Sequence, residues 1–184
     1  MKDLQQIFSQ IYDNNLDSVY RFIYFKVNSE EIAQDLCSDV FLRFWHTLKG
    51  KENKHKKEKA IKNPKAFLYQ IARNLIVDYY RGKAKAQFVS TDDVSIADPR
   101  TDPEEEALIK SDVEQIKKLL FNLNEDYREV ILLRYVEDLS ISEISSILKK
   151  KESTVRVLLH RGLKALKKEI KQKEAYFNHE IKEG

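Results

Sequence analysis

The chain has 184 residues, of which 42% are hydrophobic, enough for one ordinary domain or two small ones, each with a modest core. Its 4 glycines and 3 prolines are few for a fold rich in β-turns, and its 1 cysteine excludes an internal disulfide framework. No run approaches 18 apolar residues, and the first 15 residues hold charges and amides where a signal peptide has an apolar run. We therefore expect a soluble, helical, cytoplasmic protein with no membrane insertion.

The net charge of +3 conceals a strong alternation along the chain. Residues 49–87 hold 12 basic and 3 acidic side chains, a net charge of +9, and residues 127–184 hold 13 and 9, a net charge of +4. Residues 1–48 and 88–126 are acidic, with net charges of −3 and −7. Basic blocks of this kind indicate a polyanionic partner, and the alternative for either block is a solvated lysine surface.

Amphipathic periodicity predicts helices over residues 4–27 and 30–48, separated by the polar stretch VNSEE. In the second helix the predicted core positions are Ala33, Leu36, Cys37, Val40, Phe44 and Leu48. The predicted outer positions are Ile32, Asp35, Asp39, Leu42, Arg43 and His46. A mixed acidic and apolar surface suits a protein partner better than DNA, although Ile32 and Leu42 could equally be ordinary exposed aliphatic residues.

A lysine-rich loop without hydrophobic periodicity, KGKENKHKKEKAIKN, precedes a long helix that we expect to run from residue 63 to a C-terminal cap at Gly82. One side of this helix requires a core: Phe67, Leu68, Ile71, Ala72, Leu75 and Tyr79. The other side carries Tyr69, Gln70, Arg73, Asn74, Tyr80 and Arg81. A helix seldom exposes so many aromatic, amide and guanidinium groups to water alone, so this second side indicates a binding surface.

The stretch FVSTDDVSIADPRTDP, residues 88–103, has the composition of an interdomain linker. Helical patterning resumes at about residue 104 and continues to about residue 173. The sequence therefore predicts an all-α protein with two small helical domains, residues 1–87 and 104–184, joined by a flexible linker.

A capping box, Ser140 with Glu143, predicts the start of a short helix whose inner residues are Ile141, Ile144, Ile147 and Leu148. A break over residues 149–152 follows, and Ser153 or Thr154 is expected to cap a second helix. Its predicted inner stripe is Val155, Leu158, Leu159, Leu163, Leu166 and Ile170, and its basic face is Arg156, His160, Arg161, Lys164, Lys167, Lys168 and Lys171.

Two helices with this spacing match a helix-turn-helix, whose second helix enters the major groove of DNA. Ser153, Thr154 and Arg156 would then lie nearest the base edges. His160 belongs to the same face, and Arg161, Lys164 and Lys168 would follow the phosphates, which add affinity without sequence choice.

Three segments, in order, resemble the bacterial RNA polymerase sigma factors of the extracytoplasmic-function (ECF) group. EEIAQDLCSDVFLRFWHTL is similar to the polymerase-binding segment of their second region, and FLYQIARNLIVDYYRGK to the promoter-melting helix that follows it. LNEDYREVILLRYVEDLSISEISSILKKKESTVRVLLHRGLKAL is similar to their fourth region, which reads the −35 element. The resemblance covers nearly the whole chain and implies core RNA polymerase and promoter DNA as partners. It leaves open an anti-sigma factor.

The resemblance gives the second side of the long helix a function in promoter opening. Capture of unstacked bases requires planar groups, amides and cations, which Tyr69, Gln70, Arg73, Asn74, Tyr80 and Arg81 would supply to the −10 element. The loop residues Asn53, His55, Lys56 and Lys57 would correspond to the loop that holds a flipped base. Alternatively, the tyrosines pack against helix 4–27 and the arginines pair with its acids.

Three positions depart from the family pattern. Lys149 and Lys150 stand where members often have glycine followed by an apolar residue, and Leu158 stands where an arginine is frequent. Asn124 replaces a frequent proline at a helix start, where an asparagine can serve as N-cap. Lys149 and Lys150 in the turn affect the angle between the two helices of the helix-turn-helix. Leu158 removes a DNA contact that an arginine would make at this position.

Two other functions are compatible with parts of the sequence. A DNA-binding regulator acting through the helix-turn-helix alone leaves the acidic face of helix 30–48 and the second side of the long helix unexplained. For an enzyme, the four histidines, at 46, 55, 160 and 179, have no metal-ligand spacing, and we recognise no phosphate loop or nucleophile motif. We therefore expect no catalytic residue, cofactor or metal.

Overall fold

The structure is a computed structural model that describes residues 2–27, 29–52, 61–87 and 113–183. Every regular element in these ranges is a helix, which confirms the predicted all-α class. The chain divides into two compact units, one with residues 1–91 and 142–150 and the other with residues 92–141 and 151–184. The predicted linker and the four loop residues Asn53, His55, Lys56 and Lys57 lie outside the described ranges.

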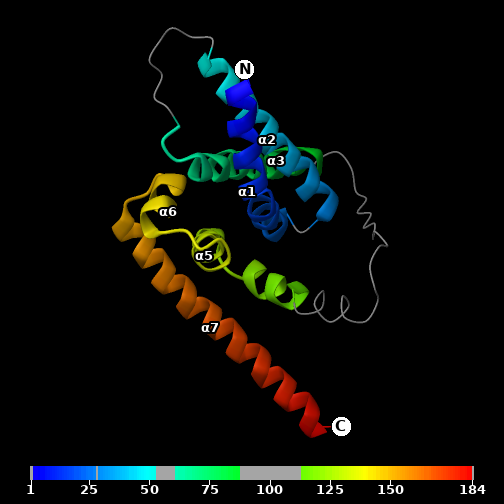
Figure 1. The fold of residues 1–184 in the computed structure, drawn as a ribbon. Coiled ribbons are helices and arrows are strands. Elements are labelled where there is room, and N and C mark those ends of the chain that lie inside the picture. The colour runs from blue at the N-terminus through cyan, green and yellow to red at the C-terminus, as the bar shows by residue number, and fades with distance from the viewer. Residues whose placement is uncertain (1, 28, 53–60, 88–112, 184) are drawn as a thin grey trace. The chain divides into compact units, whose positions relative to one another are not determined.

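Three helices build the core of the first unit (Figure 1): α1 (Lys2–Val27), α2 (Glu30–Glu52) and α3 (Pro64–Gln87). Each contacts the other two. Phe22, Phe44 and Leu68 are fully buried among them. The ring of Phe44 lies 6.2 Å from that of Phe67, so α2 and α3 meet through aromatic side chains. The helices predicted over residues 4–27 and 30–48 are confirmed, although Phe41, which was not among the predicted inner positions of α2, is also buried.

The burial of α3 corrects one prediction about its second side. Tyr69 is fully buried, and its ring meets that of Phe22 edge to face with centroids 5.3 Å apart. Because α3 packs against both α1 and α2, it buries a wider arc than a helix with a single neighbour, and this arc also includes Ile76. The predicted outward position of Tyr69 is therefore wrong, and packing against helix 4–27 is correct for this tyrosine.

The predicted end of the third helix is also wrong. α3 continues through Gly82 to Gln87, and no described glycine has a positive φ, which a C-terminal glycine cap requires. A Cβ at Gly82 would have no atom within 4 Å, so this exposed glycine lies inside the helix without a packing reason.

In the second unit, residues 113–121 are helical, and α5 (Glu125–Ile131) and the π-helix η1 (Leu132–Val136) follow. Asn124 caps α5, because its side-chain oxygen accepts a hydrogen bond of 2.9 Å from the backbone N–H of Asp126. This confirms the N-cap predicted for Asn124. α5 packs against the long helix α7 (Glu152–Glu183) at Gly162, where an added Cβ would lie 3.2 Å from both Tyr127 and Ile131.

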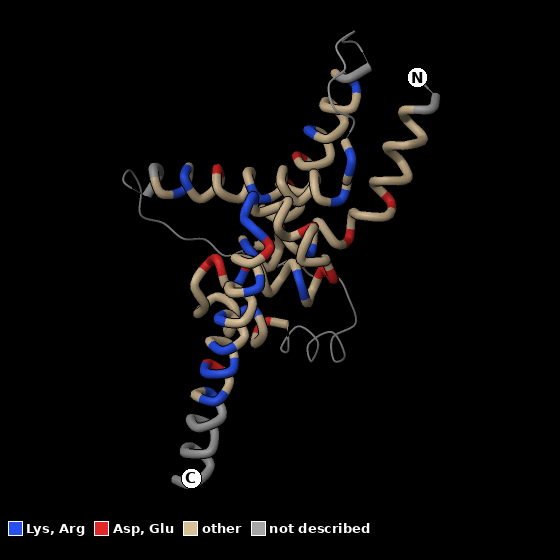
Figure 2. The backbone as a smooth tube through the Cα atoms, turned by 90° about the vertical axis from the view of Figure 1, so that its left-hand side faces the viewer, with Lys and Arg blue, Asp and Glu red and all other residues tan. Residues whose placement is uncertain are grey.

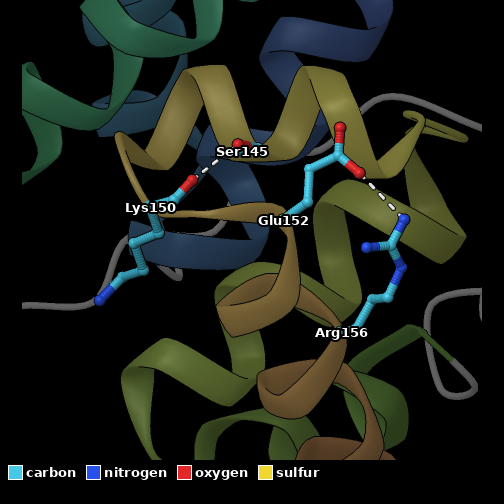
Figure 3. Close-up of polar contacts among 4 residues, drawn as sticks. All are labelled: Ser145, Lys150, Glu152 and Arg156. Atoms are coloured by element: carbon cyan, nitrogen blue, oxygen red, sulfur yellow. Dashed lines mark hydrogen bonds and ion pairs between the residues drawn. The ribbon is translucent and has the colours of Figure 1, made fainter.

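The helix α6 (Ile141–Leu148) begins directly after Ser140, as the capping box predicts. Since α7 starts at Glu152, the break is limited to residues 149–151, and Ser153 and Thr154 lie in the first turn of α7. The prediction that either residue caps this helix is wrong. Lys149 adopts a positive φ of 52°, and Ser145 Oγ donates a 2.6 Å hydrogen bond to the Lys150 carbonyl (Figure 3). α7 also extends beyond its predicted end at about residue 173.

Candidate DNA-binding and partner-binding surfaces

The residues predicted to contact −35 DNA form an exposed face of α7, along which basic residues recur in Figure 2. Exposed members of this face are Ser153, Thr154, Arg156, His160, Arg161, Lys164 and Lys168. Val155 and Leu159 are buried on the opposite side, as predicted. Leu163 and Ile170, predicted to point inward, are instead 40% and 38% exposed, so the buried stripe of α7 is narrower than its sequence pattern suggests.

An ion pair orients the arginine expected nearest the bases. Nη2 of Arg156 lies 2.9 Å from Oε2 of Glu152, one turn earlier in α7 (Figure 3). The two side chains are 61% and 44% exposed. The sequence patterns that identified the basic face did not identify Glu152, although its i,i+4 spacing from Arg156 is a signal that could have done so.

The cations farther along α7 line a hollow of about 720 Å³ with Tyr127 of α5. Its basic residues are Arg161, Lys164, Lys167, Lys168 and Lys171. The packing of α5 against α7 thus brings an aromatic ring beside a row of cations, which suits a phosphate backbone. Tyr127 was not predicted as a site residue, because its proximity to α7 depends on tertiary packing.

The exposed part of the second side of α3 is smaller than predicted. Asn74 and Arg81 are exposed, Gln70 and Arg73 are half-buried, and Tyr80 is 40% exposed. The Tyr80 hydroxyl donates a 2.7 Å hydrogen bond to the Lys26 carbonyl, which fixes the ring at the end of α1. Arg81 lies 4.0 Å from Asp78 of its own helix.

The predicted partner-binding face of α2 is largely exposed. Its exposed members are Asp35, Asp39, Leu42, Arg43 and His46, whereas Ile32 is half-buried. Leu42 is 53% exposed and borders a hollow of about 420 Å³ that is lined also by Phe8, Phe41 and Trp45. Acidic groups and an apolar depression therefore occur on the same helix. Phe8 and Trp45 were not predicted, since the hollow forms only where α1 meets α2.

Cys37 is buried, as predicted, and burial raises the pKa of its thiol from 9.0 to about 11. The thiol is therefore protonated at neutral pH and a poor nucleophile. No cluster of three or more His, Cys, Asp or Glu side chains suited to a metal ion occurs in the described residues. Among the same residues, no helix is both long and apolar enough to span a membrane.

Two family models match the chain: Sigma-70 region 2 over residues 11–86 and Sigma-70, region 4 over residues 113–166. The chain is 31% identical over 145 residues to the ECF RNA polymerase sigma factor ShbA of Streptomyces griseus, with 75% of this chain and 69% of ShbA covered. It is 29% identical over 175 residues to the ECF RNA polymerase sigma factor SigX of Bacillus subtilis, with 91% and 85% covered.

A similar fold occurs in the sigma factor RpoE of Bartonella quintana, solved in complex with the anti-sigma factor NepR. The TM-score is 0.64 at 21% identity, with 93% of this chain and 98% of RpoE covered. The two family models match the chain in the same order as the segments identified in the sequence. The relatives ShbA and SigX are sigma factors too. The chain belongs to the ECF group of RNA polymerase sigma factors.

Proposed function

We propose that this sigma factor binds promoter DNA through both of its regions and core RNA polymerase through the first. Residues 1–87 bind the polymerase and the −10 element, residues 104–184 bind the −35 element, and residues 88–103 join the two. The observation that supports this proposal most directly is the exposed basic face of α7, a helix that follows the short helix α6 after a break of three residues.

At the −35 element, Ser153, Thr154 and Arg156 contact base edges because they lie in the first turns of α7. His160 and the cations Arg161, Lys164 and Lys168 follow the phosphates, where the hollow beside Tyr127 adds Lys167 and Lys171.

At the −10 element, Tyr80 offers a stacking plane, and Gln70, Arg73, Asn74 and Arg81 offer hydrogen bonds and positive charge. Asn53, His55, Lys56 and Lys57 of the preceding loop stay part of this proposal. Tyr69 does not, because its ring is buried.

The exposed face of α2 binds the polymerase. Asp35, Asp39 and Leu42 supply the acidic and apolar groups of this contact, and Arg43, His46 and Ile32 border them. An anti-sigma factor is a further proposed partner, since RpoE was solved with one. We place the protein in the cytoplasm and assign it no enzymatic activity, as expected for an RNA polymerase sigma factor.

Run-off transcription with core polymerase and genomic fragments tests this function. Wild-type protein should copurify with the core enzyme and produce discrete transcripts. Leu42→Arg inserts a charge into the proposed polymerase contact, so it should reduce copurification while circular dichroism remains unchanged. Leu163→Arg is the matched control, because Leu163 is also an exposed leucine but lies on α7. DNA binding without any association with core polymerase would instead favour an autonomous DNA-binding regulator.

A further inference from the structure

An acidic residue occupies the end of α7 that the proposed −35 contact uses. Glu152 is the first residue of this helix, and its carboxylate holds the guanidinium of Arg156 at 2.9 Å. Between residues 152 and 173 the other acid is Glu169, whose carboxylate accepts a 3.1 Å hydrogen bond from Asn122. A carboxylate among DNA-facing cations repels phosphates and lowers the affinity for DNA of any sequence.

Stability alone gives a weak reason for this arrangement. An acid in the first turn of a helix interacts favourably with the helix dipole, but Asp or Glu at another first-turn position would do the same. The pair with Arg156 is solvent-exposed, with side chains 61% and 44% accessible, and exposed ion pairs contribute little to folding. Neither effect requires the carboxylate to hold the arginine nearest the bases.

We propose that Glu152 is a specificity-determining residue of the −35 contact; this inference rests on the proposed function of α7. In the major groove an arginine donates two hydrogen bonds to guanine, whereas a carboxylate accepts one from the amino group of cytosine. Glu152 and Arg156 are one helical turn apart in the chain, and the ion pair brings the carboxylate acceptor and the guanidinium donors next to each other. Glu152 and Arg156 thus suit neighbouring cytosine and guanine bases.

The same pair acts against other DNA sequences. Where no cytosine amine is available, the carboxylate stays close to phosphates or to acceptor groups of the bases and is repelled by them. It also remains bound to Arg156 and competes with phosphates for the guanidinium. Glu152 therefore lowers binding to non-cognate DNA more than binding to the cognate element, and discrimination rises while total affinity falls.

The test uses holoenzyme made with the full-length chain and a promoter library randomised over the −35 element. The wild-type protein should select cytosine at one position beside a selected guanine. Glu152→Gln removes the charge and keeps the shape. It should bind non-cognate DNA more tightly, lower the cognate-to-non-cognate ratio by about tenfold, and lose the cytosine preference. Glu125→Gln is the matched control, because Glu125 is also a first-turn acid but belongs to α5.

A selected library and an affinity ratio identical to those of the wild type would overturn the inference. An equal loss of binding to all sequences would do so too, since it indicates a role in helix stability only. Arg156→Ala and Lys168→Ala in the same assay test the underlying interface. If neither alters DNA binding, the proposed −35 surface itself is wrong, whereas effects of these two variants without an effect of Glu152→Gln reject Glu152 alone.

Discussion

Two tyrosines of α3 differ in their surroundings and therefore in their roles. Tyr69 lies in the core against Phe22, whereas Tyr80 is 40% exposed and its ring is fixed by its hydroxyl. The same residue type thus stabilises the fold at one position and offers a stacking plane at the other. Substitution at each position should separate stability from promoter opening.

Tyr69→Ala should lower the free energy of unfolding by about 3–5 kcal/mol, as expected when a large buried aromatic side chain is lost. Urea denaturation measures this loss of stability.

Tyr80→Ala should weaken capture of a −10 base by about 1–3 kcal/mol, because the variant loses the ring on which the base stacks. Permanganate footprinting of holoenzyme on duplex and premelted templates measures this defect in promoter opening. The premelted template should rescue Tyr80→Ala. Normal opening of duplex promoters by this variant would mean that Tyr80 does not stack on a base and that α3 has only a structural role.

Cys37 should make stability depend on pH in the alkaline range. Its pKa rises from 9.0 in the unfolded chain to about 11 in the folded one, so the folded state retains a proton that the unfolded state loses. This contribution is complete below pH 9 and is lost as the pH rises toward 11. Denaturant unfolding of wild type and Cys37→Ala, compared across this range, isolates the thiol. Parallel pH profiles would contradict the assignment.

Lys149→Gly should stabilise the protein by about 0.5–1 kcal/mol, because the positive φ at this position is unfavourable for lysine and accessible to glycine. Lys149→Ala removes the same side chain but retains the backbone strain, so its melting temperature should not rise. Thermal unfolding of both variants distinguishes backbone strain from a loss of lysine charge, which would affect both equally.

At the scale of helices, hydrophobic periodicity predicted α1 and α2, and a capping box predicted the start of α6. The buried arcs of α2 and α3 could not be predicted in full, since Phe41 and Tyr69 are buried beside the predicted inner positions. Each of the three helices contacts the other two, and the local pattern does not reveal these neighbours. The π-helix η1 was not anticipated either. Its residues LLRYV are compatible with an ordinary α-helix, and the shift in hydrogen bonding leaves no distinct mark in the sequence.

Two helical glycines should respond in opposite directions. Gly82→Ala should raise the free energy of unfolding by about 1 kcal/mol, because Ala has the higher helix propensity and its Cβ meets no atom within 4 Å. Gly162→Val should destabilise the protein by about 1–3 kcal/mol, since its Cβ would lie 3.2 Å from both Ile131 and Tyr127 and overpack the contact between α5 and α7. Urea unfolding measures both; destabilisation by Gly82→Ala would mean that this glycine has an unrecognised role.

Over the whole molecule, acidic and basic side chains occur on different proposed binding surfaces. Asp35 and Asp39 of α2 occur on the proposed polymerase face, whereas cations recur along the exposed face of α7. The near-neutral total of +3 therefore says little about the affinity for DNA, which depends on local cations. The alternation was predictable from sequence, but the hollow that brings Tyr127 beside the lysines of α7 required the fold.

Lys168→Ala should flatten the salt dependence of promoter binding. Removal of one phosphate contact should reduce the slope of log K against log salt concentration by about 0.9, with a similar loss of affinity for every sequence. Lys118→Ala is the control, because Lys118 is exposed but lies in the helical residues 113–121. Filter binding of each holoenzyme across a salt series gives the slopes. Equal slopes for Lys168→Ala and wild type would remove Lys168 from the phosphate contact.

The hydrogen bond from Tyr80 to the Lys26 carbonyl has a consequence for the entropy of promoter opening. Carbonyls in the last turn of a helix lack intrahelical partners, and this hydroxyl satisfies one of them at the end of α1. The ring has thus lost much of its rotational freedom during folding, before any base arrives. A base that stacks on it meets a plane already held in place, so less entropy is lost on binding than with a freely rotating ring. Phenylalanine would retain the plane but release it.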